Sequence, residues 1–78
     1  MLQNKNTPAK AMGSVVRAEL ARRGQPISSL LPYVEISRGA LYSRVRGDSA
    51  FNIVELHQVA SHLEMTVSEL VSMAEAPV

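Results

Sequence analysis

The sequence of 78 residues contains no cysteine and no tryptophan. Without cysteine the chain cannot form a disulfide, a thiolate zinc site, an iron–sulfur centre or a cysteine nucleophile. Its apolar runs are only a few residues long, which is too short for a helix to span a membrane. The largely polar residues 1–6 lack the apolar stretch of a signal peptide. We therefore expect a cytoplasmic protein that does not contact a membrane.

The length allows one small domain. A chain of this size buries only about 60–65% of its unfolded surface, so its stability margin is thin. Hydrophobic residues make up 46% of the sequence, as in a folded domain rather than a disordered chain. We expect a flexible arm over residues 1–9, the domain over residues 10–75 and a short tail over residues 76–78.

The net charge of +1 conceals a division of the charged residues along the chain. Residues 1–47 contain all eight Lys and Arg residues and two acids, whereas residues 48–78 contain five acids and no Lys or Arg. A positive part suits a polyanionic partner, and a negative part suits solvent or a different partner. Chance clustering of surface charges is the alternative explanation.

Hydrophobic spacing predicts five short helices and no strand. The first covers residues 10–23, where apolar residues recur at spacing four, and Gly24 follows it as a left-handed cap. The second lies within residues 25–34. Pro32 is unfavourable inside that helix, which must either start late or bend there.

Cap residues mark the other three helices. Ser37 is the expected N-cap of the third, and Asn52 and Thr66 each precede a glutamate by three residues, as in a capping box. These helices are expected over residues 38–46, 53–63 and 67–74.

The helix over residues 38–46 differs from the two that follow it. It begins with Arg38, where the helix dipole disfavours a cation, and residues 37–47 contain no acid. Such an N-terminus suits an anionic partner, and a solvated basic face on an ordinary bundle is the alternative. Leu41 and Val45, four residues apart, are the expected buried stripe.

Two segments carry a resemblance to a known family. Residues 27–47 (ISSLLPYVEISRGALYSRVRG) and residues 51–70 (FNIVELHQVASHLEMTVSEL) resemble the helix-turn-helix and the following helices of the lambda-repressor-like family. That family includes phage repressors, Cro proteins and xenobiotic-response-element regulators. The chain departs from the family pattern at Ile27, Leu31 and Glu35, where glutamine, a small residue and glycine are usual.

The resemblance implies an all-α, compact bundle of five short helices with a helix-turn-helix, in a Cro-sized protein. It implies a sequence-specific transcriptional regulator of double-stranded DNA, a repressor of phage or prophage type in a bacterial cell. The helix over residues 37–46 would read the major groove, and a homodimer would bind a palindromic operator. A protein-interaction module on the same fold, such as an antirepressor, antitoxin or adaptor, is the alternative.

The expected contacts follow from this arrangement, with Arg38 gripping guanine through two hydrogen bonds. Base contacts are expected from Arg38, Gly39, Tyr42 and Ser43. Phosphate contacts are expected from Gln25, Ser28, Ser29, Ser37, Arg44, Arg46 and Asn52. Nonspecific attraction is expected from Lys5 and Lys10. The fifth helix is the expected dimer contact, through Leu70, Val71 and Met73.

Several of these residues also have ordinary structural interpretations. Tyr42 can cover the edge of the core instead of touching DNA, and the fifth helix can close the core of the monomer. The α-helical surface formed by Arg17, Arg22 and Arg23 is expected to be solvated.

An enzyme is not expected. His57 and His62 are five residues apart on one helix, which places them on different faces, unlike metal ligands four residues apart. The chain has no Gly-rich phosphate loop and is too short for a cleft of the usual size. We therefore expect no catalytic residue, metal, cofactor or small-molecule ligand.

Overall fold

The computed structural model describes residues 7–76. Within that range the chain forms four α-helices and one short 3₁₀-helix, with no strand. The expected all-α class is confirmed, but the described residues form four α-helices rather than the five expected. In chain order the elements are α1 (Pro8–Arg22), η1 (Ile27–Leu30), α2 (Arg38–Arg46), α3 (Ile53–Leu63) and α4 (Val67–Glu75).

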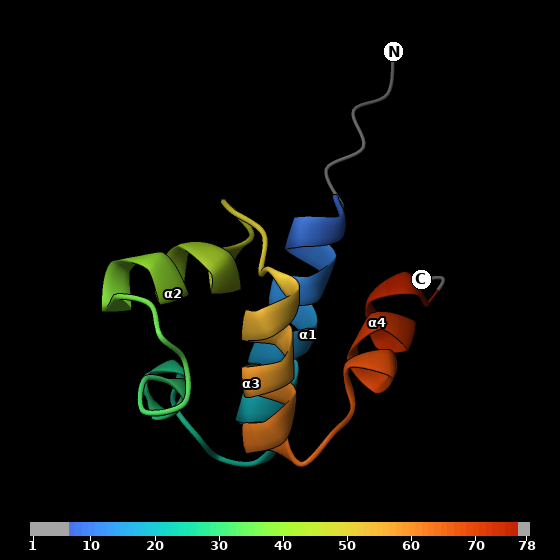
Figure 1. Ribbon diagram of the computed structural model, residues 1–78. Helices are drawn as coiled ribbons and strands as arrows, with labels where there is room; N and C mark the ends of the chain where they lie inside the picture. The colour runs from blue at the N-terminus through green and yellow to red at the C-terminus, as the bar shows by residue number, and fades with distance from the viewer. Residues whose placement is uncertain (1–6, 77–78) are drawn as a thin grey trace.

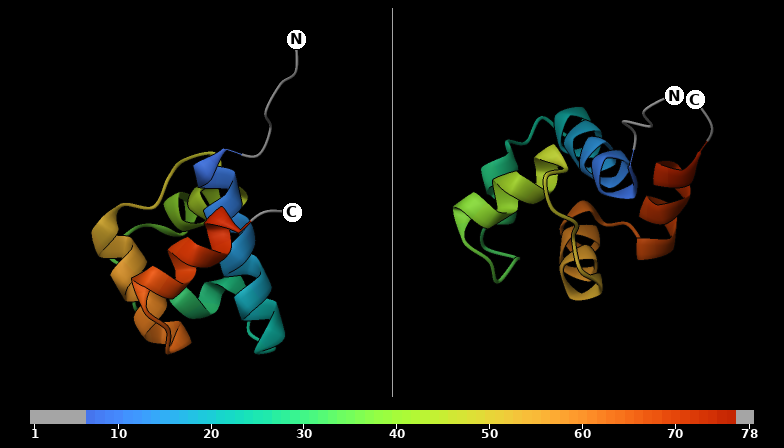
Figure 2. Two further views of the ribbon diagram at one scale, coloured as in Figure 1. Left: turned by 90° about the vertical axis from the view of Figure 1, so that its right-hand side faces the viewer. Right: turned by 90° about the horizontal axis from the view of Figure 1, so that it is seen from above.

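Helix α1 is central to the arrangement, because it contacts α2, α3 and α4. Figure 1 shows α3 in front of α1, with α2 on one side of the pair and α4 on the other, and the view from above in Figure 2 agrees. The closest packing of α1 is against α2 and α4. No helix in residues 7–76 combines the length and the apolarity needed to cross a bilayer.

The first helix begins two residues earlier than expected. Thr7 is its N-cap, with the side chain accepting a hydrogen bond from the Lys10 amide at 3.2 Å, and Pro8 occupies the first turn. Proline is well tolerated there because its missing N–H would have no partner in the helix. The rest of the expected arm, residues 1–6 with Lys5, and the end of the expected tail, residues 77–78, lie outside the described residues.

The second expected helix is wrong as an α-helix. Only Ile27–Leu30 are helical, in a 3₁₀ turn, and residues 31–33 continue as turns. Pro26 occupies the N-cap position, and Pro32 lacks the N–H that an α-helix requires. Five residues between two prolines leave no room for a stable α-helix, so neither the late start nor the bend occurs.

The predicted N-caps are confirmed. Ser37 accepts a hydrogen bond from the Ala40 amide at 3.1 Å, which begins α2. Asn52 and Thr66 form complete capping boxes at the starts of α3 and α4. Each box satisfies backbone N–H groups that the first turn of a helix leaves without partners.

The helix ends are set by residues in the left-handed conformation. Gly24 and Gly47 have φ angles of 65° and 84°, as glycine at these positions allows. Glu64 ends α3 with a φ of 57°, which is unusual for a residue with a Cβ atom.

One hydrophobic core joins all five elements. Leu41 and Val45 of α2 are fully buried, which confirms the predicted stripe. The best-buried side chains come from every element and share exposures below 2%: Val16, Leu20, Leu30, Leu41, Val45, Val59, Leu63 and Leu70.

Candidate nucleic-acid interface

The C-terminal end of α2 is fixed against α1. A Cβ atom on Gly13 would lie 2.4 Å from the Val45 carbonyl oxygen, so only glycine permits this close crossing. Arg17 donates a hydrogen bond from its guanidinium to the same carbonyl. Gly47 lies equally close to Lys10, because a Cβ there would be 2.6 Å from the Lys10 Cα. The N-terminal end of α2 therefore points away from the bundle (Figure 1).

The outward end of α2 carries the residues predicted to contact bases. Arg38 and Gly39 are exposed, and a Cβ atom on Gly39 would meet no atom within 4 Å. Arg38, Tyr42 and Arg46 are spaced by four residues and therefore share one face of the helix. Tyr42 and Ser43 are half-buried, and Ser43 lies 3.0 Å from Ser49, hydroxyl to hydroxyl.

Arg44 lies on a different side of α2 and contacts α3. Its Nε atom is 2.6 Å from Oε1 of Glu55, which is 4% exposed. The Arg44 guanidinium also donates to the Ala40 carbonyl oxygen at 3.3 Å. Glu55 in turn forms the capping box with Asn52. This geometry gives Arg44 a role in joining α2 to α3 and does not suit the predicted phosphate contact.

Arg46 is available to solvent. It pairs with Asp48 at 3.0 Å, and the two side chains are 60% and 54% exposed. An exposed pair of this kind contributes only about 0–1 kcal/mol, so a phosphate can replace the carboxylate at little cost. Arg46 therefore remains well suited to a phosphate contact.

The polar residues near η1 contact α3. Gln25 accepts a hydrogen bond from Nε2 of His62 at 2.7 Å, and the Ser29 hydroxyl lies 3.2 Å from the same nitrogen. The ring of Tyr33 is tilted over His62, with ring centroids 4.5 Å apart. Gln25 and Ser29, predicted to contact phosphate, thus bind this histidine of α3, while Ser28 is half-buried.

The side chains of the two predicted cap residues are already engaged. Ser37 and Asn52 are exposed, yet their oxygens accept hydrogen bonds from the Ala40 and Glu55 amides at 3.1 and 2.8 Å. The backbone N–H of Asn52 is engaged as well, because it donates to Oε1 of Glu55 at 3.1 Å.

Arg17 of α1 and Arg23, the C-cap of this helix, do more than form the expected solvated face. Arg17 reaches the last turn of α2, and Arg23 donates to the Leu63 carbonyl oxygen, at the end of α3, at 2.9 Å. Both satisfy carbonyl groups that a helix end leaves without partners. These partners are 28 and 40 residues distant in sequence, so local sequence patterns gave no signal for them.

Glu19 holds two cations at the end of α1. It is 4% exposed and lies 2.6 Å from Arg23 and 2.7 Å from Arg22. The Arg23 hydrogen bond, supported by both positive charges, lowers the pKa of the Glu19 carboxyl despite its burial. Arg22 and Arg23 therefore share one carboxylate, which offsets half of their combined charge.

The predicted dimer contacts are divided between the core and the surface. Leu70 is fully buried in the monomer, so it is not available for the dimer contact we predict. Val71 is half-buried, and Met73 is 38% exposed. Sequence reasoning did not single out the most exposed large aliphatic residues, Ile53 and Val54, at 60% and 58% exposure.

No group of three His, Cys, Asp or Glu side chains within residues 7–76 is placed to hold a metal ion.

The comparisons with known proteins found no match: no family model matches the chain, and no curated protein or solved structure matches it significantly.

Proposed function

We propose that this protein is a sequence-specific transcriptional regulator that binds double-stranded DNA, a repressor of phage or prophage type. In this proposal η1 and α2 form the helix-turn-helix, and α2 enters the major groove N-terminus first. The supporting observation is the outward end of α2, which is free of acids and carries exposed Arg38. Its opposite end is fixed on α1 through Gly13, so the reading helix is held rigidly.

The side chains of α2 take different parts in this proposal. Arg38 reads guanine, and Gly39 lets the backbone approach the bases because open space surrounds it. Tyr42 and Ser43, one turn further, contact a base edge or a thymine methyl group. Arg46 binds phosphate, together with the backbone N–H groups at the start of α2.

Three other residues predicted to contact phosphate have a supporting role in this proposal. Arg44, Gln25 and Ser29 are engaged with α3, so we assign them to holding the DNA-binding surface in place. Such support affects DNA binding through geometry and stability rather than direct contact. Asn52 joins them, because its side chain and its backbone N–H are both engaged with Glu55 in the capping box of α3.

A selection from random duplexes tests the proposal. The purified protein should enrich a palindromic sequence, because two half-sites about one helical turn apart match a two-fold dimer. Binding to that duplex should weaken steeply between about 50 and 200 mM salt, since phosphate contacts release counterions. An absence of enrichment would favour the alternative, a protein-interaction module on this fold.

Two substitutions separate reading of bases from binding of phosphate. Arg38→Ala should flatten the preference among duplexes, whereas Arg46→Ala should weaken binding to all duplexes alike. Arg22→Ala is the matched control, because it removes the same charge from an exposed side chain on α1. Equal effects of Arg38→Ala and Arg22→Ala would show that Arg38 contributes only net charge.

A further inference from the structure

An acid lies beside the arginine that the proposed function assigns to phosphate. The Asp48 carboxylate is 3.0 Å from Nε of Arg46, and both side chains are more than half exposed. Arg38, on the same face of α2, has no acidic partner within the described residues. The two exposed arginines of this face therefore differ in the charge that surrounds them.

Hydrogen bonding and packing hold the backbone of Asp48 at the end of α2. Its N–H donates a hydrogen bond to the Ser43 carbonyl oxygen at 3.0 Å. Gly47, the residue before it, has a φ of 84° and lies against Lys10 of α1. The Asp48 carboxylate therefore stays within reach of Arg46.

The stability of the fold gives little reason for an acid at this position. The C-terminus of a helix carries a partial negative charge, which disfavours a carboxylate beside it. The pair with Arg46 offsets this effect only weakly, because both partners are exposed to water. Asparagine suits the same turn without the charge. The charge of Asp48 therefore matters more to an approaching anion than to the fold.

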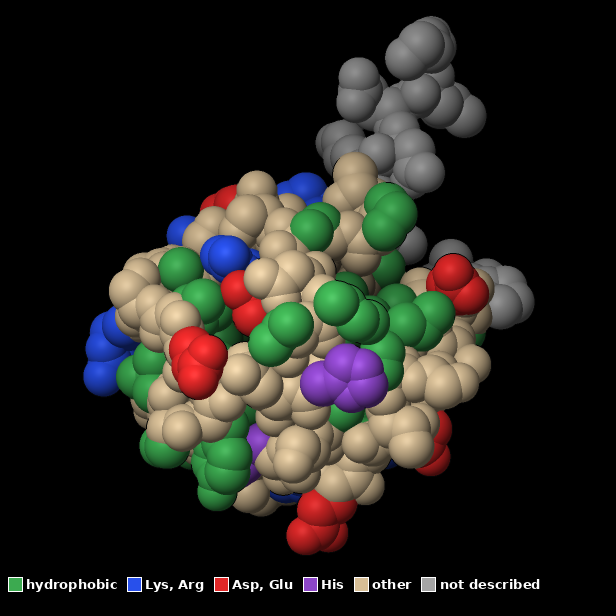
Figure 3. All heavy atoms as spheres, viewed as in Figure 1, with side chains coloured by type: hydrophobic (Ala, Val, Ile, Leu, Met, Phe, Trp, Pro, Cys, Tyr) green, Lys and Arg blue, Asp and Glu red, His purple; other side chains and the backbone are tan. Residues whose placement is uncertain are grey.

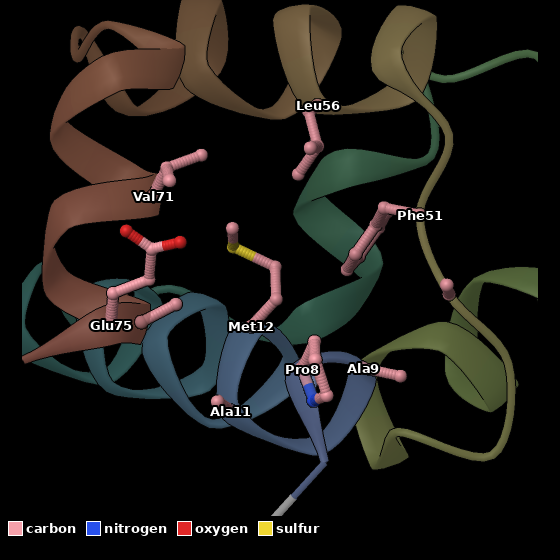
Figure 4. A pocket seen from close by; sticks show the side chains of 10 residues that line it. Pro8, Ala9, Ala11, Met12, Phe51, Leu56, Val71 and Glu75 are labelled. Carbon is pink, nitrogen blue, oxygen red and sulfur yellow. The ribbon is translucent and has the colours of Figure 1, made fainter.

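The acid at the end of α4 lies in different surroundings. On the face seen in Figure 3, basic side chains lie toward α2, and acidic side chains are close to them. Glu75, the last residue of α4, instead borders an apolar hollow of about 460 Å³ (Figure 4). No Lys or Arg is among the described residues that line this hollow. Glu75 is therefore a matched acid for comparison, because it is exposed and at a helix end but has no basic residue beside it.

We propose that Asp48 competes with DNA phosphate for Arg46 and thereby limits the affinity of the protein for every duplex. The inference rests on the proposed function, which assigns Arg46 to phosphate. Phosphate displaces the carboxylate from the guanidinium, but the fixed backbone keeps the acid nearby. A negative charge beside a phosphate weakens binding whatever the base sequence. Asp48 thus sets the overall affinity, whereas Arg38 sets the preference among sequences.

The affinities of variants for duplex DNA, measured by fluorescence anisotropy at one salt concentration, test this competition. Asp48→Asn should bind a duplex with one half-site about three- to fivefold more tightly, a factor that corresponds to an exposed ion pair. The gain should be the same for an unrelated duplex of equal length. Glu75→Gln, which removes the same charge, should gain less, and Asp48→Glu, which keeps the charge, should bind as the wild type does.

Combining Asp48→Asn with Arg46→Ala tests whether the effect acts through Arg46. In the Arg46→Ala background no guanidinium is released, so Asp48→Asn should gain no more than Glu75→Gln does. Urea denaturation should show nearly unchanged stability for Asp48→Asn, because asparagine suits the same turn. A large loss of stability would instead assign Asp48 a structural role.

Three results of the binding experiments would overturn the inference and leave the proposed function standing. Equal gains in Asp48→Asn and Glu75→Gln would show that only net charge matters. A gain that persists without Arg46 would show that no competition for Arg46 occurs. A changed preference among sequences would place Asp48 in base reading. A wild type that binds no duplex would refute the proposed function itself, and this inference with it.

Discussion

Replacing Gly13 by alanine tests how α2 is held. Alanine is the better helix former by about 1 kcal/mol, and Gly13 lies inside α1, so propensity alone predicts stabilisation. The structure predicts the opposite. The added Cβ would lie 2.4 Å from the Val45 carbonyl oxygen, 3.0 Å from its carbon and 3.1 Å from the Arg44 carbonyl oxygen.

The cost is large because the atoms in the way belong to the backbone. A side chain could rotate aside, but these carbonyl groups form the last turn of α2 and can move only with the whole helix. Overpacking of this kind costs about 1–3 kcal/mol, occasionally more. Moving α2 also disturbs the Arg17 hydrogen bond and the burial of Leu41 and Val45. After the gain of about 1 kcal/mol in helix propensity, we expect a net loss of up to about 2 kcal/mol.

Urea denaturation followed by circular dichroism measures this change, and Gly39→Ala is the matched control. Gly39 is also helical, but a Cβ there would meet no atom within 4 Å, so its substitution should be neutral or stabilise by up to about 1 kcal/mol. In thermal unfolding each 1 kcal/mol should shift the melting temperature by about 4–8 °C. A Gly13→Ala variant as stable as the wild type would refute the close crossing of α1 and α2.

Three further substitutions test the ends of the helices. Glu64→Gly should stabilise the protein by up to about 1 kcal/mol in urea denaturation, because it relieves a side chain held at a φ of 57°; a loss of stability would contradict this. Arg17→Met should lower the free energy of unfolding by about 1 kcal/mol or more, because it leaves the Val45 carbonyl oxygen without its donor. Arg22→Met, which removes an exposed ion pair, should lower it by about 1 kcal/mol or less. Equal losses in the two variants would contradict the role of Arg17. Folding lowers the pKa of Glu19 from 4.5, so the folded protein binds fewer protons at this group than the unfolded protein does. The stabilising effect of Glu19 is therefore lost as the pH falls from 4.5 through the pKa in the folded protein. Urea titrations at several pH values should therefore show the difference in unfolding free energy between wild type and Glu19→Gln narrowing below pH 4.5, and a constant difference would contradict the pairing.

The features that sequence predicted correctly depend on residues three or four positions apart. Asn52 and Thr66 begin helices because their side chains bond to amides within the next turn. Gly24 ends α1 because it adopts a positive φ without strain. The buried pair Leu41 and Val45 follows from spacing alone. In each case the physical cause is local, so no knowledge of the partner helix was needed.

The errors arose where local rules compete. The segment between Pro26 and Pro32 contains apolar residues at helical spacing, and this pattern predicted an α-helix. Two prolines limit the number of backbone hydrogen bonds that such a helix can form, and the chain adopts the shorter 3₁₀ turn Ile27–Leu30. At Pro8 the same residue type extends α1, because proline in the first turn sacrifices no hydrogen bond.

The candidate site was predictable in position but not in its partners. Sequence indicated α2 and its basic residues, yet it gave no means of knowing that Arg44 pairs with buried Glu55. Nor did it indicate that His62 binds Gln25, 37 residues away. Such contacts depend on how α3 packs beside α2 and η1, and this packing is a property of the whole fold.

The structure also changes the meaning of the uneven charge distribution. Arg44 and Arg46 pair with acids from beyond Gly47, and Arg22 and Arg23 share Glu19. Four arginines in the first part of the chain therefore have acidic partners in the folded protein, three carboxylates in all.

Arg38 stands apart from these arginines. Within residues 7–76 it has no hydrogen-bond or ion-pair partner, and it occupies the first position of α2, where a cation opposes the helix dipole by about 0.3–1 kcal/mol. A glutamate at that position would stabilise the free protein better, as Glu55 and Glu69 do in the first turns of α3 and α4. A cation that costs stability in the free protein and faces solvent makes sense if an anion meets it there. The phosphate-lined major groove in our proposal supplies that anion, and guanine supplies the acceptors for its guanidinium.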